Sequence, residues 1–152
     1  MDLSTLWSWQ GFLRGRVNTL LVCNYNELVI KKSKNSYAII DSYNQILSEL
    51  KYYDFNLDNF DWILVADVET DPYHRNKGLA TRIMNELYND ITTKYPNKGL
   101  YLFVRIENEV AIKFYEKIGF IKVKNYELKD GWYIIMCKGN ANIHQFDNRN
   151  FS

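Results

Sequence analysis

A strand, a short loop containing glycine and a helix follow one another without interruption in the middle of the chain. Residues 62–70 are too apolar for a strand with one solvated face, so they predict a central strand of a sheet. Residues 79–95 carry an apolar residue at every fourth position, which predicts an amphipathic helix. The apolar stripe consists of Leu79, Ile83, Leu87 and Ile91. The fold must therefore start a helix at the end of a buried strand, directly after the loop at residues 71–78.

The loop has the features of an anion site. The first N–H groups of a helix have no partner within the helix, and the helix dipole adds partial positive charge there. Arg75 and Lys77 supply full charges, and Gly78 allows an anion to approach the backbone closely. A diphosphate would fit such a site, although Gly78 alone would indicate only a tight turn. The residues expected to bind it are Arg75, Asn76, Lys77, Gly78, Leu79 and Ala80.

Two motifs in this half of the chain resemble those of one enzyme family. The spacing Pro72-x-x-Arg75-x-x-Gly78-x-Ala80 resembles the acyl-CoA signature of the GNAT superfamily of N-acetyltransferases. Residues 108–120 resemble a second motif of that family, Asn-x-x-Ala-x-x-Phe/Leu-Tyr-Glu-Lys-x-Gly-Phe. The motifs stand in the family's order, with one helix and one strand between them. The resemblance covers about residues 62–138.

The expected fold is α/β, a central mixed sheet flanked by helices as in GNAT proteins, in a single domain spanning residues 1–152. Residues 1–61 form an atypical N-terminal part, because they depart from the family's usual order of a strand and two helices. Residues 140–152 form a polar tail. We expect strands at 17–23, 28–32, 36–41, 62–70, 100–106, 120–128 and 132–138, and helices at 42–53, 79–95 and 109–118. The helix at 42–53 follows from its spacing of apolar residues.

Composition excludes several other classes of protein. The net charge of +1 gives no reason to expect binding to nucleic acid or to an anionic membrane surface. No apolar run approaches the ~20 residues of a membrane-spanning helix. Cys23 and Cys137 are interpreted as reduced, buried thiols of a cytoplasmic protein. The histidines and cysteines lack metal-ligand spacing, so no metal is expected. A P-loop and a Gly-x-Gly-x-x-Gly motif are both absent from the sequence.

The resemblance implies acetyl-CoA as the donor and a primary amine as the acceptor, which attacks the thioester directly without a covalent enzyme intermediate. It also implies that the pantetheine arm lies along the central strand and uses the backbone of Val68 and Thr70. Ordinary sheet pairing is the alternative for these two residues. Asn108 would reach the pantetheine or the substrate, or it could simply cap the following helix, and one residue could do both.

Tyr115 is the candidate general acid. A phenol with a pKa near ~10 can protonate a developing thiolate at neutral pH, and the resemblance places the family's tyrosine at this position. Packing in the core is the alternative. Glu69 is the candidate general base, acting through water, with Asp67 and Glu107 as further candidates; each could equally be a solvated or ion-paired carboxylate. His74 lies in the anion loop and is poorly placed to act as a base.

Three functions remain open at this stage. The first is an acetyl-CoA-dependent N-acetyltransferase. The second is an acyltransferase using a longer acyl-CoA, and the third is a non-catalytic domain that binds CoA or a partner. The acceptor would be a small molecule or a peptide, and a homodimer is left open. Residues 1–60 are expected to determine the acceptor and to have little part in donor binding.

Overall fold

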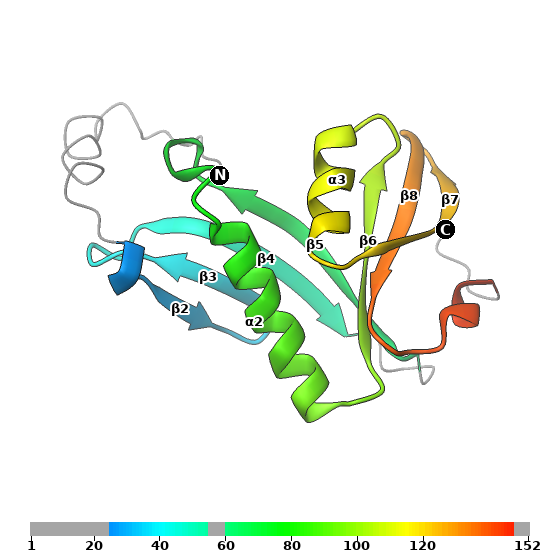
Figure 1. The fold of residues 1–152 in the computed structure, drawn as a ribbon, viewed down its shortest axis with the longest axis horizontal. Helices are drawn as coiled ribbons and strands as arrows, with labels where there is room; N and C mark the ends of the chain where they lie inside the picture. Colours follow the sequence, from blue (N-terminus) through cyan, green and yellow to red (C-terminus); the bar gives the residue numbers. More distant parts are fainter. Residues whose placement is uncertain (1–24, 55–59, 148–152) are drawn as a thin grey trace.

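The computed structural model describes residues 25–54 and 60–147 of the chain. These residues form one seven-stranded sheet in the order β2–β3–β4–β5–β6–β8–β7 (Figure 1). Neighbouring strands are antiparallel except for β5 and β6, which are parallel. The strands are β2 (Val29–Lys32), β3 (Ser36–Ile40), β4 (Ile46–Asp54), β5 (Trp62–Thr70), β6 (Gly99–Arg105), β7 (Ile121–Leu128) and β8 (Gly131–Lys138). The helices are α2 (Leu79–Lys94) and α3 (Glu109–Lys117), with 3-10 turns η1 (Tyr25–Glu27), η3 (Pro72–His74) and η4 (Ile143–Asp147).

The predicted α/β class with a mixed sheet is confirmed. From Trp62 onward, each predicted strand and helix begins and ends within about two residues of the observed one. Gly119 follows α3 with a φ of 104°, as expected for a glycine that terminates a helix. The strand predicted at 17–23 lies outside the described residues.

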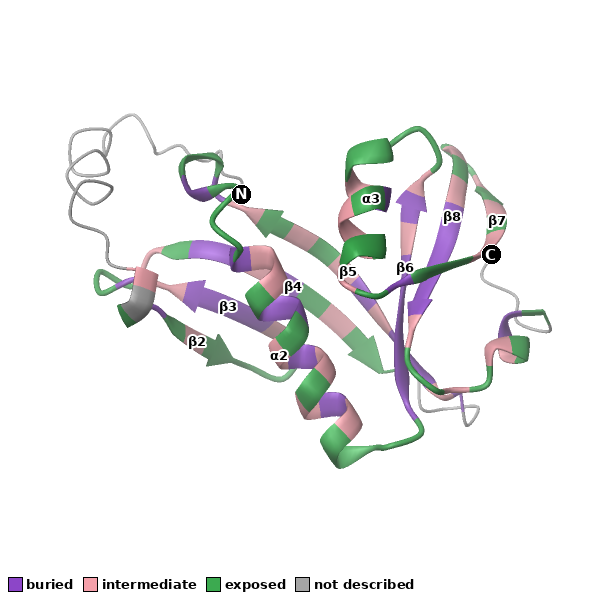
Figure 2. Cartoon of the chain, in the orientation of Figure 1, coloured by how far each residue is buried: buried purple, intermediate pink, exposed green. Residues whose placement is uncertain are grey.

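The core lies mainly between the sheet and its two helices. On β6, Leu100 and Leu102 belong to the cluster that includes both helices, whereas Tyr101 and Phe103 point to a second cluster on the opposite face. This alternation is the normal consequence of the pleat, and it shows that α2 and α3 cover the same face. Strands β6 and β8 contain long runs of buried residues (Figure 2), which explains why residues 100–106 read as an apolar run in the sequence.

The helix predicted at 42–53 is wrong, because this segment forms a turn and then β4. Ile40 pairs with Ile46 and Ile39 pairs with Ser48, so Leu47 is an extra residue in β4. Such a bulge shifts the strand's alternation, and both Leu47 and Leu50 enter the core on the helix-covered face. Two apolar residues three positions apart on one face imitate helical spacing, which is why the pattern was misleading.

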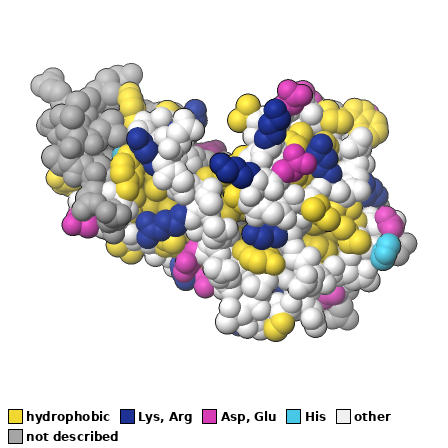
Figure 3. Space-filling view, in the orientation of Figure 1, with side chains coloured by type: hydrophobic (Ala, Val, Ile, Leu, Met, Phe, Trp, Pro, Cys, Tyr) yellow, Lys and Arg dark blue, Asp and Glu magenta, His cyan; other side chains and the backbone are white. Residues whose placement is uncertain are grey.

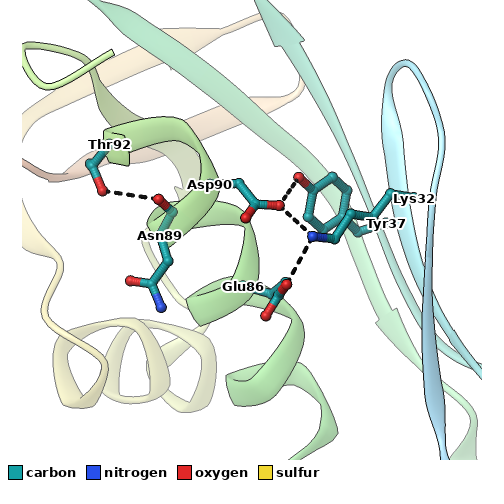
Figure 4. Close-up of polar contacts among 6 residues, drawn as sticks. All are labelled: Lys32, Tyr37, Glu86, Asn89, Asp90 and Thr92. Carbon is teal, nitrogen blue, oxygen red and sulfur yellow. Dashed lines mark hydrogen bonds and ion pairs between the residues drawn. The ribbon is translucent and has the colours of Figure 1, made fainter. Parts of the chain in front are cut away.

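Helix α2 is fastened to the N-terminal strands by a polar cluster (Figure 4). The Lys32 ammonium lies 2.8 Å from a Glu86 oxygen and 2.7 Å from an Asp90 oxygen. The Tyr37 hydroxyl donates to the same Asp90 carboxylate at 2.5 Å. Burial and this carboxylate raise the pKa of Tyr37, and the hydrogen bond from Lys32 lowers the pKa of Asp90. These contacts hold the C-terminal half of α2 against β2 and β3.

Candidate active site

The parallel strands β5 and β6 separate after a short region of pairing. Their register covers only three pairs, the first of which is Trp62 with Gly99 and the last Leu64 with Tyr101. Beyond these pairs the two strands diverge, and α3 stands in front of the opening (Figure 1). The outer part of β5 therefore presents backbone groups toward the opening that no β6 residue pairs with.

A cavity of about 910 Å³ lies at this opening. It is lined by the end of β5, the anion loop with the start of α2, and one side of α3 along its whole length. In the space-filling view the surface is hollowed here, with Lys and Arg side chains beside the hollow (Figure 3). The sequence-predicted residues that line it are Val68, Glu69, Thr70, Arg75, Asn76, Gly78, Leu79, Ala80, Asn108 and Tyr115. The fold thus collects nearly all of the predicted site residues around one space.

A bulge in β5 determines which side chains face the cavity. Glu49 pairs with Glu69 and Lys51 with Ala66, so β5 has one residue more than β4 in this stretch, and Asp67 has a φ of 51°. Because of the extra residue, Val68 packs on the helix-covered face, while Leu64 packs on the opposite one. Without the bulge these two side chains would share a face. The shift brings Val68 into the cavity lining.

The anion loop has an unusual backbone. Asn76 and Gly78 have φ values of 62° and 75°, in the left-handed region. The first intrahelical bond of α2 runs from Arg82 N to Gly78 O, so the preceding N–H groups of the helix remain available as donors. Apart from its two chain neighbours, no atom of the described residues lies within 4 Å of a Cβ added at Gly78. The glycine therefore borders open space, as an anion site requires.

Lys77 is the predicted anion-binding residue that the structure places elsewhere. It is not among the residues that line the cavity. Its ammonium lies 6.0 Å from the centroid of the Tyr25 ring instead. Arg75 does line the cavity, and its Nε donates to the Thr70 carbonyl at 3.4 Å. Of the two loop cations, Arg75 is therefore the one beside the cavity.

The end of β5 is held by a serine that sequence analysis placed in a helix. Ser48 is buried in β4, and its hydroxyl lies 3.2 Å from the Glu69 carbonyl and 3.0 Å from the Thr70 hydroxyl. A turn signal in the sequence just before β4 could have shown that Ser48 lies in a strand. There Asp41 accepts hydrogen bonds from the N–H groups of Tyr43 and Gln45, as aspartates in turns commonly do.

Asn108 has the structural role that was one of its two predicted roles. Its side-chain oxygen accepts a hydrogen bond of 3.2 Å from the Ala111 N–H, which makes it the N-cap of α3. It also lines the cavity. The other lining residues, which are not among the predicted site residues, are Pro72, His74, Thr81, Val110, Ala111, Phe114 and Lys117; four of them, Pro72, Ala111, Phe114 and Lys117, stand at named positions of the two motifs. Helical spacing from Asn108 could have found Ala111 and Phe114, since residues three apart share a helix face.

Tyr115 combines a packed ring with a place at the cavity. Its ring meets Phe114 and Phe120 edge to face, with centroids 5.2 Å and 5.6 Å away. Within the described residues its hydroxyl has no hydrogen-bond partner. Burial raises the pKa of Tyr115 above its ordinary value, so the phenol stays protonated at neutral pH. The ring of Tyr115 therefore packs in the core, which was one of its two predicted roles. Its hydroxyl is left to act as a proton donor, which was the other.

The three candidate bases differ in their surroundings. Glu69 is exposed and lines the cavity. Asp67 is exposed at the bulge but does not line the cavity. Glu107 lies 3.2 Å from the Arg105 guanidinium, so it is an ion-paired carboxylate. Glu69 is therefore the candidate with the best position.

The described residues contain no candidate metal site. No set of three or more of their His, Cys, Asp and Glu side chains could hold a metal ion. No helix in the described part of the chain is long and apolar enough to cross a membrane. Cys137 is a free, buried thiol, and burial raises its pKa to about 12. Cys23 lies outside the described residues.

Comparison with known proteins points to the same family as the motifs. Residues 61–128 match the family model described as "FR47-like protein". An N-alpha-acetyltransferase of Saccharolobus solfataricus is 39% identical over 51 residues, which are 34% of this chain and 30% of that protein. The chain thus aligns with about a third of the length of the curated relative it matches.

Solved structures share the fold at low sequence identity. A variant of the spermidine N-acetyltransferase of Vibrio cholerae has a TM-score of 0.61 at 16% identity, covering 89% of this chain and 76% of that chain. The ribosomal-protein-S18-alanine N-acetyltransferase of Escherichia coli has a TM-score of 0.58 at 18% identity, covering 82% and 77%. The fold is that of the GNAT acyl-CoA N-acyltransferases. The family-model match to residues 61–128, the archaeal relative and this fold agree with the resemblance to the GNAT superfamily that the motifs indicated.

Proposed function

We propose that the protein is an N-acetyltransferase that transfers an acetyl group from acetyl-CoA to a primary amine by direct attack in a ternary complex. The cavity is the observation on which the proposal depends. The end of β5, the anion loop and Tyr115 all line it. The relatives named above are N-acetyltransferases, which supports the reaction class.

The shape and charge of the cavity fit acetyl-CoA. The diphosphate would lie at the N–H groups from Gly78 to Ala80, with Arg75 beside it, where the missing side chain of Gly78 leaves room. The pantetheine arm would lie in the opening between β5 and β6 and bond to backbone groups of Val68 and Thr70, which have no pairing partner in β6. Asn108 would contact the same arm while it caps α3.

The proposed chemistry needs three proton transfers. The ammonium of the acceptor gives a proton to Glu69 through a water molecule, and the neutral nitrogen attacks the thioester carbonyl carbon. The carbon–nitrogen bond forms and the nitrogen loses its second proton to water, while the carbon–sulfur bond breaks and the departing sulfur takes the proton of the Tyr115 hydroxyl. Tyr115 then regains a proton from solvent.

A binding assay combined with a thiol-release assay tests this proposal against its alternatives. Calorimetry should show binding of acetyl-CoA, and a panel of small amines and peptides should contain one that releases CoA thiol. Release with butyryl- or octanoyl-CoA but not acetyl-CoA would indicate a longer-chain acyltransferase. Binding without release for any acyl group and any acceptor would indicate a CoA-binding domain. If CoA did not bind at all, the site assignment would be wrong.

A further inference from the structure

The residues just before β2 contact both the anion loop and the start of α2. The hydroxyl of Tyr25 lies 2.8 Å from Nδ1 of His74, and the two rings meet edge to face at 5.7 Å. Three residues further along, the Leu28 carbonyl accepts a hydrogen bond of 3.0 Å from the Arg82 guanidinium in α2. The segment is therefore bonded to both elements that form the proposed diphosphate site.

His74 connects Tyr25 to the loop. It is completely buried at the end of η3 and is followed directly by Arg75. Its backbone N–H donates to the Asp71 carbonyl at 2.8 Å, and the Asp71 N–H donates to the Leu47 carbonyl at 2.8 Å. Backbone bonds thus tie the first half of the loop to β4, and the His74 side chain ties it to Tyr25.

The second half of the loop contains a left-handed residue with a side chain. Asn76 has a φ of 62°, a conformation that asparagine adopts more readily than most residues. Lys77, the next residue, extends toward the Tyr25 ring, with its ammonium 6.0 Å from the centroid. Tyr25 therefore contacts a residue on each side of Arg75, one through its hydroxyl and one through its ring.

We propose that Tyr25 is a positioning residue for the acyl donor. Its contacts with His74 and Lys77 hold the anion loop in the form that binds the CoA diphosphate, so the segment before β2 contributes to donor affinity. This inference rests on the proposed function. It reverses the expectation from sequence that residues 1–60 have little part in donor binding. An anion site binds well only when its donors are already in place, because ordering the loop would otherwise reduce the affinity.

Tyr25→Phe tests the inference because it removes the hydroxyl and keeps the ring. Tyr37→Phe is the matched control, since it also removes one tyrosine hydroxyl. That hydroxyl donates to Asp90 of α2, which lies more than two helical turns from the anion loop. Calorimetry with CoA and NMR titration with pantetheine, which lacks the diphosphate, would be run on both variants. Thermal unfolding would confirm that each is folded.

We expect Tyr25→Phe to raise the Kd for CoA by about three- to tenfold, the effect of losing one hydrogen bond, and to leave pantetheine affinity unchanged. Tyr37→Phe should change neither. His74→Gln should weaken CoA binding similarly, and adding Tyr25→Phe to it should cause little further loss. Equal CoA affinity in wild type and folded Tyr25→Phe would overturn the inference and leave the proposed function intact. Parallel loss of CoA and pantetheine binding would also overturn it, whereas a wild type that does not bind CoA would reject both.

Discussion

Gly78 offers the sharpest test of where the donor binds. Its φ of 75° means that any other residue strains the backbone, by about 1–2 kcal/mol for an alanine. For a chain of this size, that cost corresponds to a fall in Tm of roughly 2–8 °C. Within residues 25–54 and 60–147, no atom other than those of its chain neighbours lies within 4 Å of the added Cβ, so Gly78→Ala causes no steric clash there. The variant should fold.

The same Cβ would stand where we place the diphosphate. It would push the phosphate away from the loop N–H groups, and a hydrogen bond to a charged group is worth about 1.5–3 kcal/mol. We therefore expect at least a tenfold rise in the Kd for CoA. Gly78→Glu adds a negative charge about 4 Å from the phosphate, which costs a further ~1 kcal/mol in water and ~4 kcal/mol near a protein surface. Binding should then fall below detection by calorimetry.

Two controls separate strain, bulk and charge. Gly119→Ala also strains a positive φ, and its Cβ would lie 3.2 Å from the end of the Lys138 side chain, whose ammonium donates to the Ile118 carbonyl; Gly119 and Lys138 are both outside the cavity lining. It should lower the Tm comparably and spare CoA binding. Gly78→Lys has the bulk of the glutamate variant without the repulsion, so it should bind CoA better than Gly78→Glu. A folded Gly78→Glu variant with wild-type CoA affinity would refute the placement of the diphosphate.

The remaining predictions concern the proton transfers and the cluster on α2. Tyr115→Phe should leave CoA affinity nearly unchanged and lower turnover by ~10²–10⁴-fold; a change below about threefold would assign Tyr115 to the core alone. Glu69→Gln should lower turnover most at low pH, where the acceptor is protonated, and an unchanged pH–rate profile would exclude it as the base. The pKa of Asp90 is lowered in the folded state, so its contribution to stability is present above the unfolded value of ~3.9 and is lost as the pH falls through the folded value. Urea unfolding should therefore show Asp90→Asn to be less stable than wild type at neutral pH and nearly equal to it at pH ~2; a difference independent of pH would contradict this.

The half of the fold after Trp62 could be predicted because its signals are local. A buried strand, a four-residue apolar repeat and a glycine at a helix end each specify an element within a few residues of sequence. The same signals predicted the place of the anion site, because the end of a strand and the start of a helix meet at the loop that joins them. For Asn108 the sequence left open a helix cap, a contact to the donor or both, and the structure shows that it caps α3 and lines the cavity.

Bulges explain where prediction from the sequence stopped. The extra residue at Leu47 made a strand look helical, and the extra residue near Asp67 placed Val68 on the face covered by the helices. A bulge is set by pairing with a neighbouring strand, so a single segment carries no pattern for it. Periodicity alone assigns side chains to faces correctly only where the pairing is regular.

Contacts between distant residues set a second limit. Tyr25 and His74 are 49 positions apart, and neither stands in a motif that names the other. Yet an anion loop binds well only when its donors are held in place, and part of that support comes from residues outside the loop. The motif therefore identifies the residues that would contact the donor. The residues that support the loop by hydrogen bonds can come from any part of the chain that folds next to it. For this reason a segment without a recognisable motif can determine how tightly a recognisable site binds.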